Sequence, residues 1–344
     1  MSTTSYAVSA KARSKYGRFL TERDYASILA CQSVPEVMVY LKSHTHFASV
    51  LSEVNERDVH RGRLEQMLRQ YLFNEFDTLC RYDSTVSAGF SRYVVEKTEV
   101  EQIVRFLILL NSNSTEKFIF EFPAFLSKHS EIDVYKLANA HDYDEFLNSL
   151  RNTSYYVILK AFKPDEKGIL PVSDIENKLY GHVLGHMFEL INKKTKGDER
   201  RELRKLFLTL NDYSIFSRII RQKKYYDLPS NVVRANMMPE FSSLSPKLID
   251  KMCAANSTAE VFQIMQSTGC GRLMNKIGYN HADNIKPRIQ YRLAKSYIHF
   301  SNNPSVVMIS FMFLSEIELM NVISMIEGIR YQLDPKTIEA MVIH

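Results

Sequence analysis

One pattern occurs three times in this sequence, at nearly equal intervals, and it constrains the fold more than any other feature. The three stretches are SVPEVMVYLKSHTH (33–46), DYDEFLNSLRNTSY (142–155) and STAEVFQIMQSTGC (257–270). Each begins with Ser or Asp and has Glu three residues later, which is the capping-box pattern of a helix N-terminus. Apolar residues at helical spacing follow in every copy. The predicted capping residues are Ser33 and Glu36, Asp142 and Glu145, and Ser257 and Glu260.

Length and composition agree with a helical protein built from such repeats. The chain has 344 residues, enough for two or three domains, and only 11 of them are glycine, which leaves few tight turns. A charged amphipathic helix is expected in the second half of each copy, at 96–110, 200–226 and 315–333. We therefore predict an all-α fold with three sequence-related helical domains, at residues 1–122, 123–237 and 238–344.

The cysteines and the apolar runs indicate the compartment. Four cysteines with no CxxC spacing and no secretory leader are typical of a reduced, cytosolic protein. The most apolar run, 305–314, is about half the length that a membrane-spanning helix needs. We expect no transmembrane segment, so any contact with a membrane would be made through another protein or through lipid headgroups.

Motifs that carry chemistry are scarce. His182 and His186 lie four residues apart with Glu189 one turn on, a spacing that can hold zinc. Position 183 is Val, however, so the Glu that serves as base in H-E-x-x-H is missing, and ordinary helix histidines are favoured over a zinc hydrolase. Phosphate-binding loops and the G-x-S-x-G elbow are also absent. We predict no catalytic residue, no metal, no cofactor and no small-molecule substrate.

A second histidine candidate lies at the end of the first repeat. The SHTH of 43–46 aligns without a gap to NTSY and STGC, so His44 shares a column with Thr153 and Thr268. A group that closes a helix end explains this equivalence better than a metal ligand does. We therefore expect His44 to act at the C-terminus of its helix.

One segment has a strong charge bias. Residues 193–224 contain eleven Lys and Arg but only four acidic residues. A solvated helix face is one reading, and a contact with an acidic protein or with anionic headgroups is the other. No nucleic-acid-binding motif accompanies the segment, so nucleic acid is not an expected partner. The candidate contact residues are Lys193, Lys194, Arg200, Arg201, Arg204, Lys205, Arg218 and Arg221.

Several of these features together resemble a known family. Tyr6 and Arg13 precede FLTERDYASIL (19–29), and EIELMNVISMIEGIRYQLDPKTIEAMV (316–342) lies near the end of the chain. The chain resembles the C/d (AC39-type) subunits of V-type and A-type rotary ATPases. The family pattern L-x-x-T-x-Y is met in full by Leu150-Thr153-Tyr155 and in degraded form by Leu41-His44-His46 and Met265-Thr268-Cys270. The family pattern Glu-x-x-Asn is met by Glu318 and Asn321.

The resemblance implies a specific function. Such subunits are all-helical, with three similar domains about a pseudo-threefold axis that form a funnel. They are non-catalytic, and they couple the central axle to the membrane proteolipid ring, so that torque passes between ATP chemistry and H⁺ or Na⁺ transport. The expected location is the cytoplasmic face of the membrane, bound through the ring. The alternative is a free-standing helical-repeat adaptor for soluble proteins, with no rotary motor attached.

Overall fold

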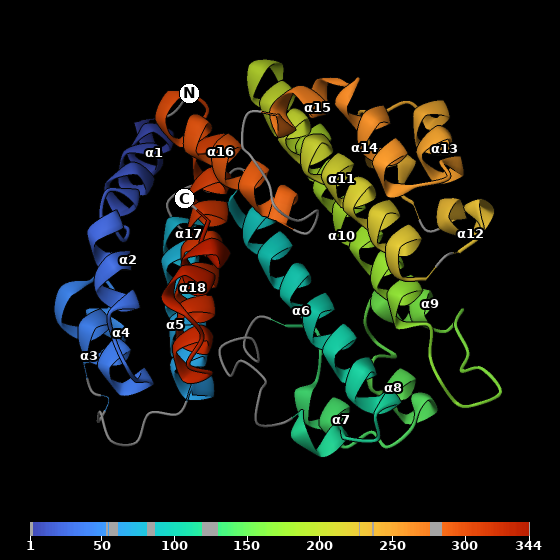
Figure 1. The fold of residues 1–344 in the computed structure, drawn as a ribbon, viewed down its shortest axis with the longest axis horizontal. Coiled ribbons are helices and arrows are strands. Elements are labelled where there is room, and N and C mark those ends of the chain that lie inside the picture. The colour runs from blue at the N-terminus through green and yellow to red at the C-terminus, as the bar shows by residue number, and fades with distance from the viewer. Residues whose placement is uncertain are drawn as a thin grey trace.

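All regular structure in the described part of the chain is helical, as the sequence predicts (Figure 1). The computed structural model describes residues 3–52, 54, 61–80, 87–118, 130–226, 228–235, 237–275 and 284–343. The predicted domain boundary at 122/123 lies outside these residues, and the three-domain division stays a prediction.

Seven helices supply the central packing. They share a core that includes Phe90 of α6, Phe207 of α11 and Phe313 of α17, each at most 2% exposed. Aromatic rings also meet edge-on there, as between Phe207 and Phe313, whose centroids are 5.9 Å apart. The seven helices are α1 (Thr3–Tyr16), α5 (Arg61–Cys80), α6 (Ser87–Asn111), α10 (Val172–Lys194), α11 (Gly197–Tyr225), α16 (Ile285–Phe300) and α17 (Pro304–Arg330).

Helix α17 corrects one expectation about the apolar run at 305–314. The run belongs to a helix of 27 residues, which by length and composition could cross a membrane. Within the protein, however, 83% of its most apolar window is buried. A helix that is apolar on nearly every side is also what the centre of a helical protein needs. The run is thus longer than the sequence suggested, and its burial is that of a core helix.

Three groups of short helices lie around these long ones, and we call them modules 1, 2 and 3. Each contains the helix that starts at one copy of the repeated pattern. Module 1 comprises α2 (Glu22–Leu29), α3 (Val34–His44) and α4 (Ala48–Leu51). Module 2 comprises α7 (Val134–Ala138), α8 (Tyr143–Ser149) and α9 (Tyr155–Leu159). Module 3 comprises α13 (Pro246–Ala254), α14 (Thr258–Gln266) and α15 (Gly269–Met274). The remaining helices are α12 (Ser230–Ala235) and α18 (Pro335–Met341), with single 3₁₀ turns at Thr115–Lys117 and Pro239–Phe241.

Each module packs on the long helix that follows it in the chain and also on a second long helix from another copy. Module 2 shares a core with α10 and with α6, and module 3 shares one with α16 and with the C-terminal half of α11. Module 1 packs on α5, and on α17 and α18 from the other end of the chain. The helices expected at 96–110, 200–226 and 315–333 therefore serve the next module along the chain, and the last of them returns to the first module (Figure 1).

The repeated helix starts are capped by side chains. Ser33 accepts a hydrogen bond from Glu36 N at 3.4 Å. The corresponding bonds are 2.8 Å from Glu145 N to Asp142 Oδ1 and 3.2 Å from Glu260 N to Ser257 Oγ. Each Glu carboxylate accepts, at 2.8 Å, from the N–H one residue before the cap; the three donors are Gln32, His141 and Asn256. This differs by one residue from the capping box, in which the Glu accepts from the cap itself.

The C-terminal end of the repeated helix also differs by one residue in the first copy. Thr153 Oγ1 donates to Leu150 O at 2.8 Å, and Thr268 Oγ1 donates to Met265 O at 2.6 Å. In the first copy the donor is Thr45, whose Oγ1 lies 2.6 Å from Leu41 O. His44 is the last residue of α3, as expected, but the hydrogen bond that closes the helix end is made by Thr45, the C-cap, and not by His44.

Loss of one cap in module 2 should lower stability without disturbing the rest of the chain. We expect Asp142→Ala and Glu145→Ala each to lower the free energy of unfolding by about 1 kcal/mol, the usual cost of a lost cap. Asp144→Ala is the matched control, since Asp144 is exposed in the same first turn and caps nothing. Urea denaturation measures the change. Equal losses for Asp142 and Asp144 would contradict the capping role.

Candidate functional site

Three buried carboxylates join the long helices to the modules. They are Glu99 on α6, Asp212 on α11 and Glu318 on α17, with exposures of 1%, 0% and 5%. A buried carboxylate is costly unless hydrogen bonds replace its water. Each of the three receives such contacts from the segment that leads into one module and from a residue at the end of the repeated pattern in that module. We call them the junction carboxylates.

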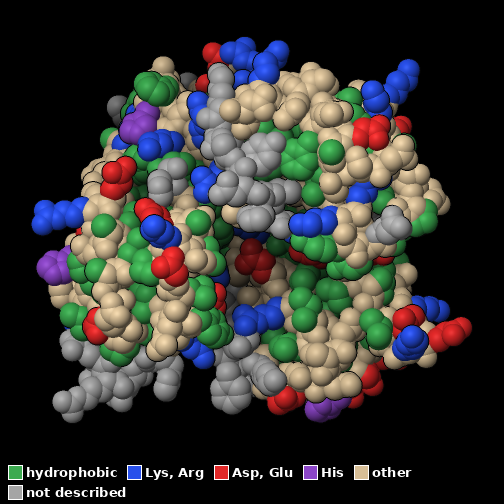
Figure 2. Space-filling model, viewed as in Figure 1, with side chains coloured by type: hydrophobic (Ala, Val, Ile, Leu, Met, Phe, Trp, Pro, Cys, Tyr) green, Lys and Arg blue, Asp and Glu red, His purple; other side chains and the backbone are tan. Residues whose placement is uncertain are grey.

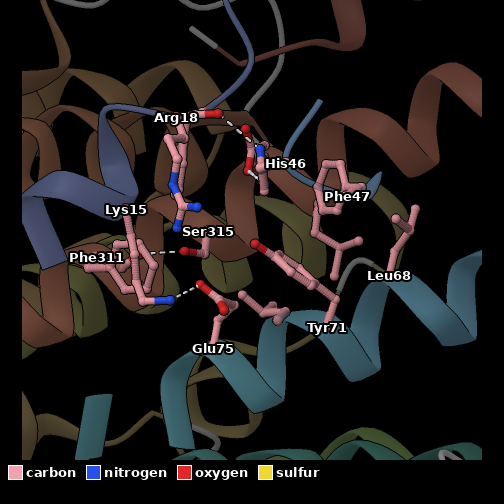
Figure 3. A pocket seen from close by; sticks show the side chains of 13 residues that line it. Lys15, Arg18, His46, Phe47, Leu68, Tyr71, Glu75, Phe311 and Ser315 are labelled. Atoms are coloured by element: carbon pink, nitrogen blue, oxygen red, sulfur yellow. Dashed lines mark hydrogen bonds and ion pairs between the residues drawn. The ribbon is translucent and has the colours of Figure 1, made fainter. Parts of the chain in front are cut away.

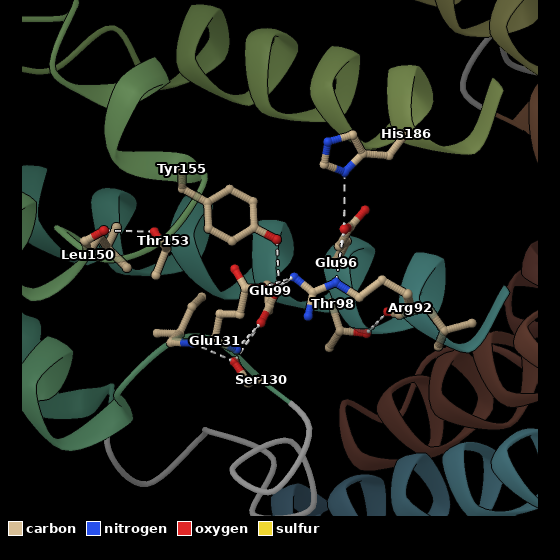
Figure 4. Close-up of polar contacts among 12 residues, drawn as sticks. Arg92, Glu96, Thr98, Glu99, Ser130, Glu131, Leu150, Thr153, Tyr155 and His186 are labelled. Carbon is tan, nitrogen blue, oxygen red and sulfur yellow. Dashed lines mark hydrogen bonds and ion pairs between the residues drawn. The ribbon is translucent and has the colours of Figure 1, made fainter. Parts of the chain in front are cut away.

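Glu99 receives donors from both sides of module 2. Tyr155 Oη donates to Glu99 Oε2 at 2.5 Å, while Ser130 Oγ and Glu131 N donate to Oε1 at 2.8 and 2.7 Å. Figure 4 shows Tyr155 pointing at Glu99 across the gap between module 2 and α6. Burial and the adjacent carboxylate raise the pKa of Tyr155 above its ordinary value, so the phenol keeps its proton and remains a donor.

Asp212 has the same arrangement in module 3. Ser243 N donates to Oδ1 at 3.0 Å, and the hydroxyls of Ser242 and Ser243 donate to the two oxygens. Cys270 Sγ lies 3.5 Å from Oδ2. Burial, followed by the proximity of Asp212, raises the pKa of the Cys270 thiol to about 12, which keeps it protonated at neutral pH.

Glu318 is the third junction carboxylate, and it binds module 1. Leu20 N donates to Glu318 Oε1 at 2.7 Å, and His46 Nε2 lies 3.3 Å from Oε2. The other ring nitrogen of His46 lies 3.0 Å from the carbonyl oxygen of Arg18. Figure 3 shows His46 beside Arg18 and facing the pocket in which Lys15 and Glu75 form an ion pair.

The three junctions use the same position of the repeated pattern. His46, Tyr155 and Cys270 occupy the last column of the gapless alignment, and each contacts a junction carboxylate. Tyr155 lies 56 residues after Glu99, and Cys270 lies 58 residues after Asp212. Glu318 is recognisable in the sequence from the Glu-x-x-Asn pattern, whereas the other two carboxylates belong to no such pattern. Their near-constant spacing from the aligned column is the signal that could have found them.

Asn321, one turn after Glu318, holds the C-terminal segment. Its amide Nδ2 donates to Ile343 O at 2.8 Å, and Ile343 N donates to Asn321 Oδ1 at 2.9 Å. Nδ2 also lies 3.3 Å from the hydroxyl of Tyr25 in module 1. The Glu-x-x-Asn pair therefore ties both ends of the chain to α17.

A polar hollow of about 480 Å³ lies between α5, α6 and α17. Figure 2 shows a hollow near the centre of this face, with acidic and basic side chains in it. Lys97 Nζ and Glu316 Oε2 pair at 2.8 Å across it. Among the residues that the structure describes, Arg61 Nε and Gln102 Oε1 are buried without a hydrogen-bond partner, so the hollow has unused polar capacity. Its charged lining residues are Arg61, Glu65, Arg69, Lys97, Glu101, Arg105 and Glu316.

The structure divides the basic residues of 193–224 among different places. Arg200, Arg201, Arg204 and Lys205 line one groove beside module 3. Lys193 and Lys194 are exposed in the last turn of α10, where Lys193 pairs with Glu189 at 2.9 Å. Arg218 is partly buried, which lowers the pKa of its guanidinium, and Arg221 is exposed. The contact role of this set stays a proposal.

The two helix histidines contact each other, and one of them contacts a carboxylate. The ring centroids of His182 and His186 are 4.1 Å apart, and His186 Nδ1 lies 3.1 Å from Glu96 Oε1 (Figure 4). Glu189 accepts from Lys193. Within the described ranges, no group of three His, Cys, Asp or Glu side chains is placed to hold a metal ion.

The Tyr155–Glu99 bond is the most direct test of a junction. We expect Tyr155→Phe to lower the free energy of unfolding by about 1.5–3 kcal/mol, because a buried carboxylate loses one donor. Tyr135→Phe is the control, since Tyr135 is 75% exposed on α7 of the same module. Both are measured by urea denaturation. Indistinguishable losses for the two variants would mean that the hydroxyl does not hold the junction.

A cation near the hollow should make stability depend on pH. Burial and repulsion from Lys97 and Arg218 lower the pKa of Lys286 to about 8, below the 10.5 of an ordinary lysine. Below pH 8 the charged Lys286 therefore lowers the stability of the folded chain. This loss of stability disappears as pH rises toward 10.5, the pKa of an ordinary lysine.

Lys286→Met should accordingly be more stable than the parent chain at pH 7, by up to about 3 kcal/mol. The difference between the two should shrink as pH rises through 8 to 10. Urea denaturation of both chains at a series of pH values measures this, and a constant difference would show that Lys286 has an ordinary pKa.

Comparison with known proteins places these features in a family. A scan against protein families matches the ATP synthase (C/AC39) subunit family over residues 8–341, nearly the whole chain. Members of this family are non-catalytic subunits of V-type and A-type ATPases. A search of curated proteins found no match. The family match includes all three modules, the junction carboxylates and Asn321, and the chain therefore belongs to the ATP synthase C/AC39 subunit family.

Proposed function

We propose that this chain is the central rotor coupler of a V/A-type ATPase. In this role it performs no chemistry and carries torque between the central axle and the proteolipid ring that moves H⁺ or Na⁺ across the membrane. It is bound to the cytoplasmic face of the membrane through the ring. The observation that carries the proposal is the family match over residues 8–341.

The connectivity of the packing supports a load-bearing role. Module 1 is bound to α17 through Glu318 and Asn321, modules 2 and 3 are bound to α6 and α11, and the chain's two ends meet. A structure closed in this way resists opening because no module sits at a free end. Buried hydrogen-bonded networks also rigidify a core when all members are satisfied. We propose that the three modules are arranged about a pseudo-threefold axis.

The polar hollow is the part of the molecule that we assign to the axle. It is bordered by three long helices, so a partner bound there would press on stiff elements. The hollow has charges of both signs, and Arg61 and Gln102 have unsatisfied polar atoms, so it suits a partner with a polar surface. Polar contacts of this kind set the orientation of a bound partner more than its affinity. Met320, 43% exposed on the rim, offers apolar contact beside them.

Site-specific cross-linking tests this assignment. A photoreactive p-benzoylphenylalanine in place of Met320 should cross-link to an axle subunit when the assembled ATPase is irradiated. The same residue in place of Tyr135 is the control, since Tyr135 is more exposed but lies on module 2.

Two outcomes would count against the assignment. If position 320 gives no axle adduct in an intact complex, the axle binds elsewhere. If the chain cross-links only to soluble proteins outside any ATPase, the free-standing adaptor is the better description.

A further inference from the structure

A second cavity has a very different charge from the central hollow. It is a groove of about 1070 Å³ between the N-terminal half of α11 and module 3. Five cationic side chains line it, and none of its lining residues is acidic, as far as the described residues extend. The cations are Arg200, Arg201, Arg204, Lys205 and Arg272. Four come from the basic segment of the sequence, while Arg272 comes from α15 on the opposite wall.

The charges of this groove are largely unopposed. Arg200 donates to the carbonyl oxygens of Thr195 and Asn192, and Arg204 donates to Asn192 Oδ1 at 3.0 Å, so their partners are neutral. Within the described part of the chain, Lys205 and Arg272 form no ion pair. Arg201 does pair with Asp198 at 2.8 Å, but both side chains are at least 70% exposed, which makes the pair weak.

The carboxylate of Asp212, which contacts two residues of the groove lining, is already occupied. It accepts from Ser242, Ser243 and Cys270, all in the junction with module 3. The thiol of Cys270, which lines the groove, is neutral at physiological pH because its pKa is raised to about 12. Neither group therefore offsets the five cations from within the groove.

The donors fit phosphate groups in kind and in placement. A guanidinium presents two N–H groups that match two oxygens of one phosphate, and a lysine adds a point charge. Ser245, the N-cap of the nine-residue helix α13, also lines the groove, so the positive end of that helix contributes. The volume is in the range of cavities that hold small ligands. Cations on two facing walls suit a ligand with several phosphates better than one with a single charge.

We propose that this groove binds a polyphosphorylated ligand, held between the α11 cations and Arg272. The ligand is either a soluble polyphosphate or the phosphorylated headgroup of a lipid, which present the same chemistry. The site is independent of the axle assignment, because it shares no lining residue with the central hollow.

Titration calorimetry with myo-inositol hexakisphosphate on the full-length chain, at physiological ionic strength, tests the proposal. The test variant is Lys205→Gln/Arg272→Gln, which removes one free cation from each wall. The control is Lys193→Gln/Lys194→Gln, which removes the same charge from exposed positions outside the groove. We expect the test variant to bind at least about tenfold more weakly, since it loses two charge-assisted contacts. The control should change affinity by less than about twofold.

Vesicle binding distinguishes a lipid headgroup from a soluble polyphosphate. Phosphatidylcholine vesicles that contain phosphatidylinositol 4,5-bisphosphate are compared with vesicles of equal charge that contain phosphatidylserine. Groove-dependent binding to the former alone identifies a lipid headgroup, and binding of the soluble probe without vesicle binding identifies a free polyphosphate.

Three results would overturn the proposal. They are no binding of hexakisphosphate, equal weakening by the test and control variants, or tighter groove-dependent binding of an oligoglutamate peptide. The last would assign the groove to an acidic protein segment. Thermal melting of each variant shows whether it is folded, and all four substituted side chains are exposed.

Discussion

The burial of a carboxylate at each of three junctions is the constraint on which the rest of the structure depends. Glu99, Asp212 and Glu318 are inaccessible to water, and each is stable only because a module supplies its hydrogen bonds. A module that moved away would leave an unpaired buried charge, which costs far more than one ordinary hydrogen bond. The carboxylates thus fix where each module sits on its long helix.

The order of these junctions along the chain explains the closed connectivity. Each module binds the long helix that precedes it, except the first, which has only α1 before it and binds α17 at the far end. The same contact between a module and a long helix therefore occurs three times, and the last long helix, α17, makes it with the first module. Asn321 adds a bond from that helix to Ile343, so the C-terminal segment is fixed at the same place. A chain closed in this way is suited to transmit force, which is the function that we propose for it.

The parts of the fold that depend on neighbouring residues could be predicted from sequence, and those that depend on distant ones could not. Helix starts at Ser33, Asp142 and Ser257 were predictable because a cap needs only three or four consecutive residues. The partners of Glu99 and Asp212 were missed because they lie about 30 to 58 residues away and meet only after the helices pack. The role expected of His44 falls to Thr45 because a gapless alignment cannot show that α3, with 11 residues, is longer than α8 and α14, with 7 and 9. Similarly, the basic segment was visible in the sequence, but its association with Arg272 arises from packing between α11 and α15.

The central claim is that this chain joins an axle to a membrane ring, and the most direct test is to isolate it with what it binds. The chain is tagged at its N-terminus, because Ile343 is held at the other end, and membranes from its native host are dissolved in mild detergent. The retained proteins are then quantified by mass spectrometry. The account predicts that a proteolipid ring subunit is recovered together with axle and ATPase head subunits. Recovery of soluble partners alone, from a preparation in which the motor is intact, would contradict it.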